Sequence, residues 1–95
     1  MIISQLSIAP VGEGTSLSKF VKIALKELDK HNLKIKTNDM ATVIETTDLD
    51  TLFNAVKDAH NAVINTGVKR VITELKIDHR LDKEVYIGTK IKSLQ

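Results

Sequence analysis

The carboxylate of Glu45 has the most unusual setting among the polar residues of this chain. It follows Thr42-Val43-Ile44 in a segment, residues 40–47, whose β-branched side chains are typical of a strand. A carboxylate in a central strand is costly to bury unless it meets a cation or several hydrogen-bond donors. Two interpretations therefore stay open: Glu45 pairs with a Lys or Arg of a neighbouring strand or subunit, or it binds a ligand.

Further polar residues near the predicted strand ends could contact a small molecule. They are Ser7, Asn38, Thr42, Glu74 and Asp78. Ser7 and Thr42 also suit strands without any ligand. For Glu74 and Asp78 we favour a structural role, as charges at a sheet edge or a subunit interface that face nearby basic residues.

The chain lacks the sequence motifs of common enzymes and metal sites. It has no cysteine, no phosphate-binding loop, no dinucleotide fingerprint, and neither an HExxH nor a GxSxG motif. The histidines, His31, His60 and His79, have no suitably spaced partners for a metal. An enzyme hypothesis rests only on Glu45, His60 and Asp78, and nothing in the sequence places these groups within hydrogen-bond reach. We therefore predict a protein without catalytic activity, metal or cofactor.

Length and charge fit a small protein of the cytoplasm. The 95 residues suffice for one domain over residues 1–95, and 42% of them are hydrophobic. A net charge of +2, with acidic residues interspersed among the basic ones, does not indicate nucleic-acid binding. No apolar stretch approaches the ~18 residues of a membrane span, and the N-terminus lacks the features of a signal peptide. We expect no nucleic-acid partner, no membrane and a cytoplasmic location.

Hydrophobic periodicity predicts four strands, two helices and a short helical tail. The strands are expected over residues 2–10, 34–37, 40–47 and 70–78. The first helix is capped by Thr15 or Ser16 and runs to about His31, and the second is capped by Asp48 and stops at Gly67. One or two further helical turns are expected between residues 86 and 94. The order β-α-β-β-α-β is typical of the ferredoxin-like α+β fold, in which two helices cover one face of a four-stranded antiparallel sheet.

Each of the two long predicted helices has an apolar stripe that we expect to pack against the sheet. The first stripe consists of Leu17, Phe20, Val21, Ala24, Leu25 and Leu28. The second consists of Leu49, Leu52, Phe53, Val56, Ala59, His60 and Val63. Because Phe20 and Phe53 lie on these stripes and Tyr86 lies in the tail, the central strands have no aromatic residue to stack on RNA bases. The sequence therefore argues against an RNA-recognition protein of this fold.

The sheet face away from the helices is predicted to mix apolar and polar side chains. It would carry Ile3, Ile72, Gln5, Ser7, Glu74 and Lys76. This mixture is too apolar for open water and too polar for a dry core. A second subunit that covers the face explains both properties.

Several segments of the chain together resemble a known family. They are Gln5–Pro10, Ser16-Leu17-Ser18, Met40–Glu45, Asp48-Leu49-Asp50, Val56–His60, and Arg70–Arg80 with Asp82-Lys83. In their order and spacing, over nearly the full length, they resemble the small thiamine-binding protein family (YkoF-like).

The resemblance implies a ferredoxin-like fold, dimers that pair into homotetramers, and binding of thiamine or its hydroxymethylpyrimidine moiety without known catalysis. Thiamine has a permanent thiazolium cation and an aminopyrimidine edge, so its site needs a carboxylate and a few fixed polar partners in an apolar pocket. By position, Glu45 would be the anionic partner, Ser7, Asn38 and Thr42 would supply hydrogen bonds, and Met40 would supply apolar packing. The alternative function is an interaction module whose sheet face serves only oligomer assembly.

Overall fold

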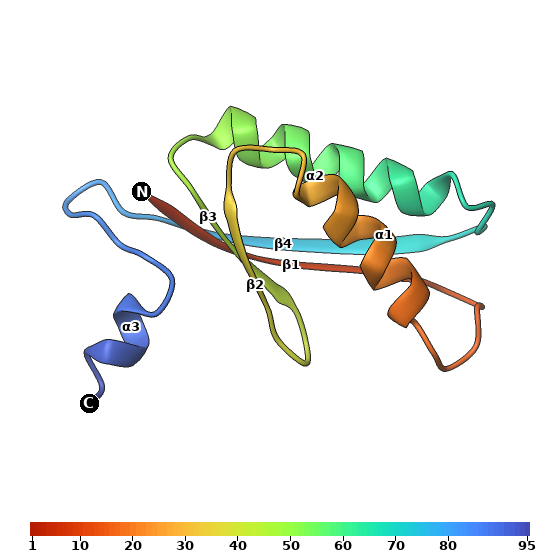
Figure 1. The fold of residues 1–95 in the computed structure, drawn as a ribbon, viewed down its shortest axis with the longest axis horizontal. Helices are drawn as coiled ribbons and strands as arrows, with labels where there is room; N and C mark the ends of the chain where they lie inside the picture. Colours follow the sequence, from red (N-terminus) through yellow and green to blue (C-terminus); the bar gives the residue numbers. More distant parts are fainter.

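A computed structural model describes all residues from Met1 to Gln95 and contains one four-stranded sheet (Figure 1). Its strands are β1 (Ile2–Pro10), β2 (Lys34–Thr37), β3 (Thr42–Thr46) and β4 (Val71–His79). The order across the sheet is β2-β3-β1-β4, and all neighbouring strands are antiparallel. The helices are α1 (Ser18–Leu28), α2 (Leu49–Ile64) and the short α3 (Thr89–Lys92). This arrangement confirms the predicted ferredoxin-like α+β fold and the helical turn in the tail.

Helices α1 and α2 lie on one side of the sheet, and the tail with α3 lies on the other side (Figure 1). Strand alternation turns Ile2, Leu6 and Ile44 toward the two long helices, where they are buried in the core. We call the opposite side of the sheet the open face. By register it carries Lys34, Lys36, Val43, Glu45, Ile3, Gln5, Ser7, Ala9, Ile72, Glu74, Lys76 and Asp78.

The core lies between the sheet and the two long helices. Its buried residues are Ile2, Leu6, Phe20, Ala24, Leu28, Ile44, Leu52, Ala55, Ala59 and Val63. Ala55 and Ala59 are fully buried and have small side chains, so α2 can approach the sheet closely. Large side chains from β1, β3 and α1 then fill the remaining space.

Helix α1 begins later and ends earlier than the sequence predicts. Thr15 and Ser16 are exposed loop residues, and Leu17 holds the N-cap position without a side-chain hydrogen bond. The side chain of Leu17 packs against the core, and its carbonyl accepts the first helical N–H groups. After Leu28 the chain closes in short turns, so His31 lies outside the helix. The preference of Thr and Ser for helix N-termini places the cap of α1 too early, because both residues suit a loop as well as a cap.

Helix α2 confirms its predicted cap but not its whole predicted stripe. Asp48 is extended, and its Oδ1 accepts the N–H of Thr51 at 2.8 Å. Phe53, however, is 49% exposed, whereas Ala55, which the stripe omits, is fully buried. The face that packs on the core therefore follows Leu52, Ala55, Ala59 and Val63, and Phe53 projects to one side of it.

Smaller differences occur in α1 and at the strand ends. Val21 of the first predicted stripe is exposed. Strand β3 starts at Thr42, because Met40 and Ala41 belong to the turn that joins it to β2. None of the helices is both long and apolar enough to cross a membrane.

Candidate functional site

A cavity of about 150 Å³ lies between α1 and the hairpin that joins β2 to β3. It is lined by Leu6, Ser7, Ile8, Val21, Ala24, Leu25, Leu28, Thr37, Asn38, Asp39, Met40, Ala41 and Thr42. One wall is apolar and comes from α1 and β1, and the other comes from the polar hairpin turn. An apolar cavity with a few polar groups at one side is the usual form of a small-molecule site.

The cavity exists because β1 continues after its pairing with β3 has ended. The last pair of that ladder is Leu6 with Thr42, whereas β1 pairs with β4 as far as Pro10. Bonds from Arg80 N to Met1 O and from Val11 N to Arg70 O show that odd-numbered residues of β1 bond to β4. Since antiparallel strands alternate, the N–H and C=O of Ile8 point the other way, where β3 has already ended. Ile8 thus offers a free backbone donor and acceptor beside the cavity.

Four of the five predicted ligand-binding residues come together at this cavity. Asn38, Met40 and Thr42 line it together with Ser7, which by register belongs to the open face and borders the cavity where the ladder between β1 and β3 ends. Glu45 does not, because it lies three residues after Thr42 in the same strand and so faces the opposite side of the sheet. Sequence reasoning also missed Asp39, although its position between two predicted site residues was a usable signal, and it assigned the α1 wall entirely to the core.

Glu45 lies on the open face but is only 6% exposed, because the C-terminal tail covers it. Its Oε1 accepts the backbone N–H of Ile87 at 2.9 Å. Its Oε2 is 3.9 Å from the Nζ of Lys34 on β2, the kind of basic neighbour that one of the two interpretations anticipates. The backbone donor from the tail has no signal in the sequence.

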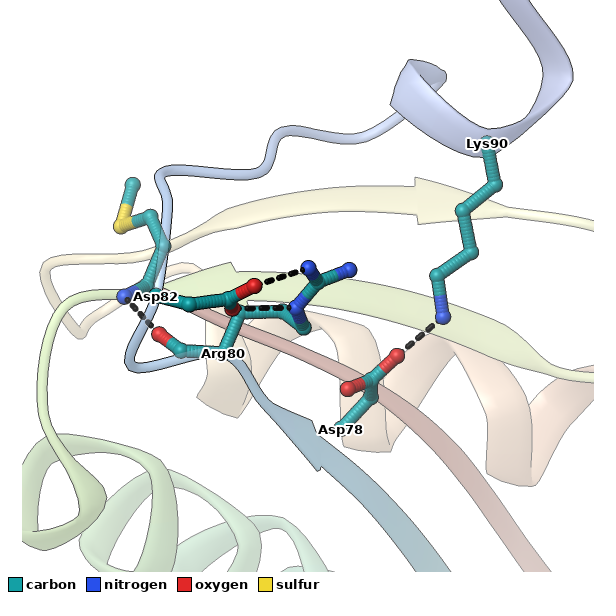
Figure 2. A network of polar contacts seen from close by, with 5 residues as sticks. Asp78, Arg80, Asp82 and Lys90 are labelled. Carbon is teal, nitrogen blue, oxygen red and sulfur yellow. Dashed lines mark hydrogen bonds and ion pairs between the residues drawn. The ribbon is translucent and has the colours of Figure 1, made fainter. Parts of the chain in front are cut away.

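Charged contacts hold the tail to the end of β4 (Figure 2). Arg80 donates from Nε and Nη2 to the two carboxylate oxygens of Asp82, at 2.7 and 2.6 Å. Lys90 of α3 donates to Asp78. Between these contacts Val85 is almost fully buried and anchors the tail by apolar packing. The hydrogen bond from Arg80 lowers the pKa of Asp82 to about 2, and the bond from Lys90 lowers the pKa of Asp78.

These lowered pKa values predict that acid loosens the tail. A carboxylate whose pKa is lower in the folded state stabilises the fold above its ordinary pKa of 3.8, and this contribution is lost as the pH falls through the folded value. We therefore expect Tyr86, the only tyrosine, to change its fluorescence as the pH falls from 3.8 to about 2. Circular dichroism of the same sample monitors α1 and α2. A Tyr86 change that occurs only together with loss of helix would contradict a separate loosening of the tail.

Two of the three histidines have individual partners and do not converge on one site. His60 Nδ1 lies 2.6 Å from the Oγ1 of Thr73, and His31 Nε2 lies 2.9 Å from the Oδ2 of Asp58. These contacts join α2 to β4 and the end of α1 to α2. No group of three or more His, Cys, Asp or Glu side chains could hold a metal ion.

The fold and the cavity define a small ferredoxin-like α+β protein with space for a compact ligand beside its hairpin. The sequence also matches a protein-family model, described as "Thiamine-binding protein", over residues 4–95. The chain belongs to this thiamine-binding protein family.

Relatives and solved structures agree with this assignment. The UPF0045 protein MJ1052 of Methanocaldococcus jannaschii is 46% identical over 93 residues, which cover 98% of this chain and 91% of that protein. The UPF0045 protein of Methanothermobacter thermautotrophicus is 42% identical, with 100% and 97% of the two chains covered. The crystal structure of MJ1052 superposes with a TM-score of 0.90 over 98% of this chain and 94% of that chain. A Thermotoga maritima protein, provisionally assigned to thiamine biosynthesis or salvage, has a TM-score of 0.81 at 17% identity, covers 99% and 98% of the two chains, and supports the fold alone.

Proposed function

We propose that this protein binds thiamine, or a smaller molecule with the same aminopyrimidine ring, in the cavity between α1 and the β2–β3 hairpin, and that it catalyses no reaction. The family supplies the ligand class. The observation that carries the location is the meeting of Ser7, Asn38, Met40 and Thr42 at one cavity.

The cavity suits one ring better than a whole thiamine molecule. Its volume of about 150 Å³ is below the roughly 300–1,000 Å³ of sites that enclose drug-sized ligands. An aminopyrimidine presents a donor and ring acceptors along one edge, and the free N–H and C=O of Ile8 are complementary to such an edge. The apolar side chains of α1, among them Ala24 and Leu28, would pack on the ring face.

The thiazolium cation of thiamine would then extend out of the cavity toward the hairpin. Asp39 lines the cavity, is exposed, and is the carboxylate available there. Glu45 as the anionic partner stays a prediction. It would require that the ligand also reach the open face, for example where two subunits meet.

Isothermal titration calorimetry tests the ligand class. We expect heat of binding with thiamine and with hydroxymethylpyrimidine. Phosphorylation of thiamine should change its affinity only slightly, because the phosphates would lie outside the cavity. Absence of heat with all three compounds at high protein concentration would refute the proposal. Self-association without ligand binding would favour the interaction-module alternative.

A matched pair of threonine variants tests the location. Thr42→Val removes a hydroxyl at the cavity, and we expect Kd to rise by about tenfold, as for a lost hydrogen bond of about 1.4 kcal/mol. Thr46→Val is the control, because Thr46 is on the same face of the same strand, outside the cavity, with a buried hydroxyl that has no partner. Equal affinities of the two variants would place the ligand elsewhere.

We further propose that the protein is a homotetramer in which two dimers cover each other's open faces. The apolar side chains of Ile3, Val43 and Ile72 share this face with charged residues, and α3 beside it exposes Ile91. Light scattering should give the mass of four chains. A single chain at working concentration would contradict this assembly.

A further inference from the structure

Met40 has an apolar side chain that lies almost entirely in water. It belongs to the turn between β2 and β3, where the N–H of Asn38 donates to the carbonyl of Ala41 at 2.9 Å, and it is 90% exposed. The chain has one other methionine, the partly buried Met1, and it has no cysteine and no tryptophan. Among the side chains that mild oxidants attack first, the thioether of Met40 is therefore the most accessible.

The turn that carries Met40 borders two hollows of the surface. On the side of α1 it lines the cavity described above, together with Val21 and Leu25. On the other side it lines a shallow groove of the open face, together with Gln5 and Val43. Figure 1 shows this turn projecting from the sheet beyond β2 and β3. Because a methionine side chain has three rotatable bonds, Met40 can move between solvent and cavity without movement of the strands.

The α1 wall of the cavity gives Met40 an apolar surface to close against. The four residues of α1 that line the cavity, Val21, Ala24, Leu25 and Leu28, are all apolar, and Val21 is 37% exposed. An unbranched thioether fits irregular gaps, and its sulfur makes favourable contacts with aromatic rings. Closure of Met40 over an aminopyrimidine in the cavity would therefore remove the ring, Val21 and the thioether from water together.

We propose that Met40 is a site of reversible oxidation through which a hydroperoxide controls ligand binding. The inference rests on the function proposed above. In the reaction the sulfur attacks the terminal oxygen of the hydroperoxide, so that an S–O bond forms and the O–O bond breaks. Sulfur loses two electrons, and the proton of the peroxide OH passes to the departing oxygen, which leaves as water or an alcohol. The product, methionine sulfoxide, is polar and is reduced again by methionine sulfoxide reductases.

Oxidation acts on binding because a sulfoxide cannot close the cavity as a thioether does. Its oxygen is a hydrogen-bond acceptor, and burial of such a group without a donor is costly. In the closed position this oxygen would lie against the α1 wall, which offers only apolar side chains. The oxidised side chain of Met40 is therefore more stable in water, and the ligand loses the apolar cover on its exposed side.

The same geometry implies that the ligand protects the sulfur of Met40. A ligand that binds the thioether form more tightly must, by linkage, favour that form when bound, and closure over the ring also shields the sulfur from peroxide. Met1 is an internal reference. Its amino group and its carbonyl both bond to the backbone of Arg80, and it lines neither the cavity nor the groove. Thiamine should therefore slow the oxidation of Met40 and leave that of Met1 unchanged.

Nuclear magnetic resonance of protein labelled at the methionine methyl groups tests the contact with the ligand. The two methionines should give two signals. We expect saturating thiamine to shift the Met40 signal and, in the presence of hydrogen peroxide, to slow its conversion to the sulfoxide signal several-fold, with no change at Met1. A Met40 signal that does not move at saturating thiamine, or equal protection of both methionines, would contradict the proposal.

Calorimetry with thiamine before and after hydrogen peroxide tests the control of binding. Once peptide mass mapping shows sulfoxide at Met40, we expect the Kd of the wild type to rise by about tenfold or more and to recover after treatment with methionine sulfoxide reductases.

Met40→Leu is the matched variant, because it keeps an apolar side chain without sulfur. Whatever its affinity before treatment, peroxide should not change its Kd. A wild-type Kd that is unaffected by oxidation of Met40, or an equal rise in Met40→Leu, would overturn this inference alone. Absence of thiamine binding by the untreated wild type would instead refute the proposed function, and this inference with it.

Discussion

Replacement of Leu52 by alanine is expected to lower the free energy of unfolding by about 2–5 kcal/mol. Leu52 is completely buried on the core face of α2, among side chains of β1, β3 and α1. Truncation removes apolar surface from the core and leaves a cavity, because β1 and β3 hold the facing side chains in place. Small proteins have total stabilities of about 5–15 kcal/mol, so the change would remove a large part. Denaturant unfolding followed by circular dichroism measures it.

The same substitution at Leu81 is the control. Leu81 is 89% exposed in the turn after β4, and its truncation should change the stability by less than about 0.5 kcal/mol. Similar losses at the two positions would show that the core lies elsewhere than between α2 and the sheet. A loss at Leu52 that disappears at low protein concentration would instead show that stability is dominated by association.

The sequence predicted the fold because burial follows the periods of strands and helices. Alternation in β1 and the stripe of α1 determine which residues face each other, and these patterns are local. The errors occur where local patterns are ambiguous. Thr15 is as suitable for a loop as for a helix cap. From the spacing alone, either Leu52 or Phe53 could lie at the centre of the buried stripe of α2. The choice between them depends on how α2 lies over β4, which is a property of the whole fold.

The candidate site was predictable in part for the same reason. Asn38, Met40 and Thr42 are close in sequence at one hairpin, so any fold with that hairpin brings them together. Ser7 joins them because it directly follows Leu6, whose pairing with Thr42 is the last of the ladder between β1 and β3. Strand alternation alone could have separated Glu45 from Thr42, because an odd spacing places two residues on opposite faces.

The role of the tail was not predictable from residue types. The contact between Glu45 and Ile87 joins positions 42 residues apart and uses a backbone N–H, which nearly every residue has. Its existence depends on where Val85 is buried and on how Arg80 and Asp82 close the turn after β4. The carboxylate of Glu45, which the sequence singles out, thus already accepts a hydrogen bond from the tail of the same chain.

Glu45 is therefore the second position where a large effect is expected. Glu45→Ala removes the acceptor of the Ile87 N–H and the partner of Lys34, and the cost of leaving such a group without a partner is about 1–3 kcal/mol. Glu45→Gln keeps an amide oxygen that can accept the N–H but loses the charge. We expect the tail to be released in the alanine variant and largely retained in the glutamine variant, as measured by hydrogen exchange at Ile87 and by Tyr86 fluorescence.

Calorimetry on the same two variants separates anchoring of the tail from binding of a cation. If Glu45 only anchors the tail, Glu45→Gln should bind thiamine as well as the wild type, and the cavity beside the hairpin should remain sufficient. If Glu45 is the anionic partner of the thiazolium, Glu45→Gln should lose thiamine binding while hydroxymethylpyrimidine, which has no thiazolium cation, still binds. Loss of both ligands in Glu45→Gln with the tail in place would contradict both roles, because neither the anchor nor the cation contact accounts for it.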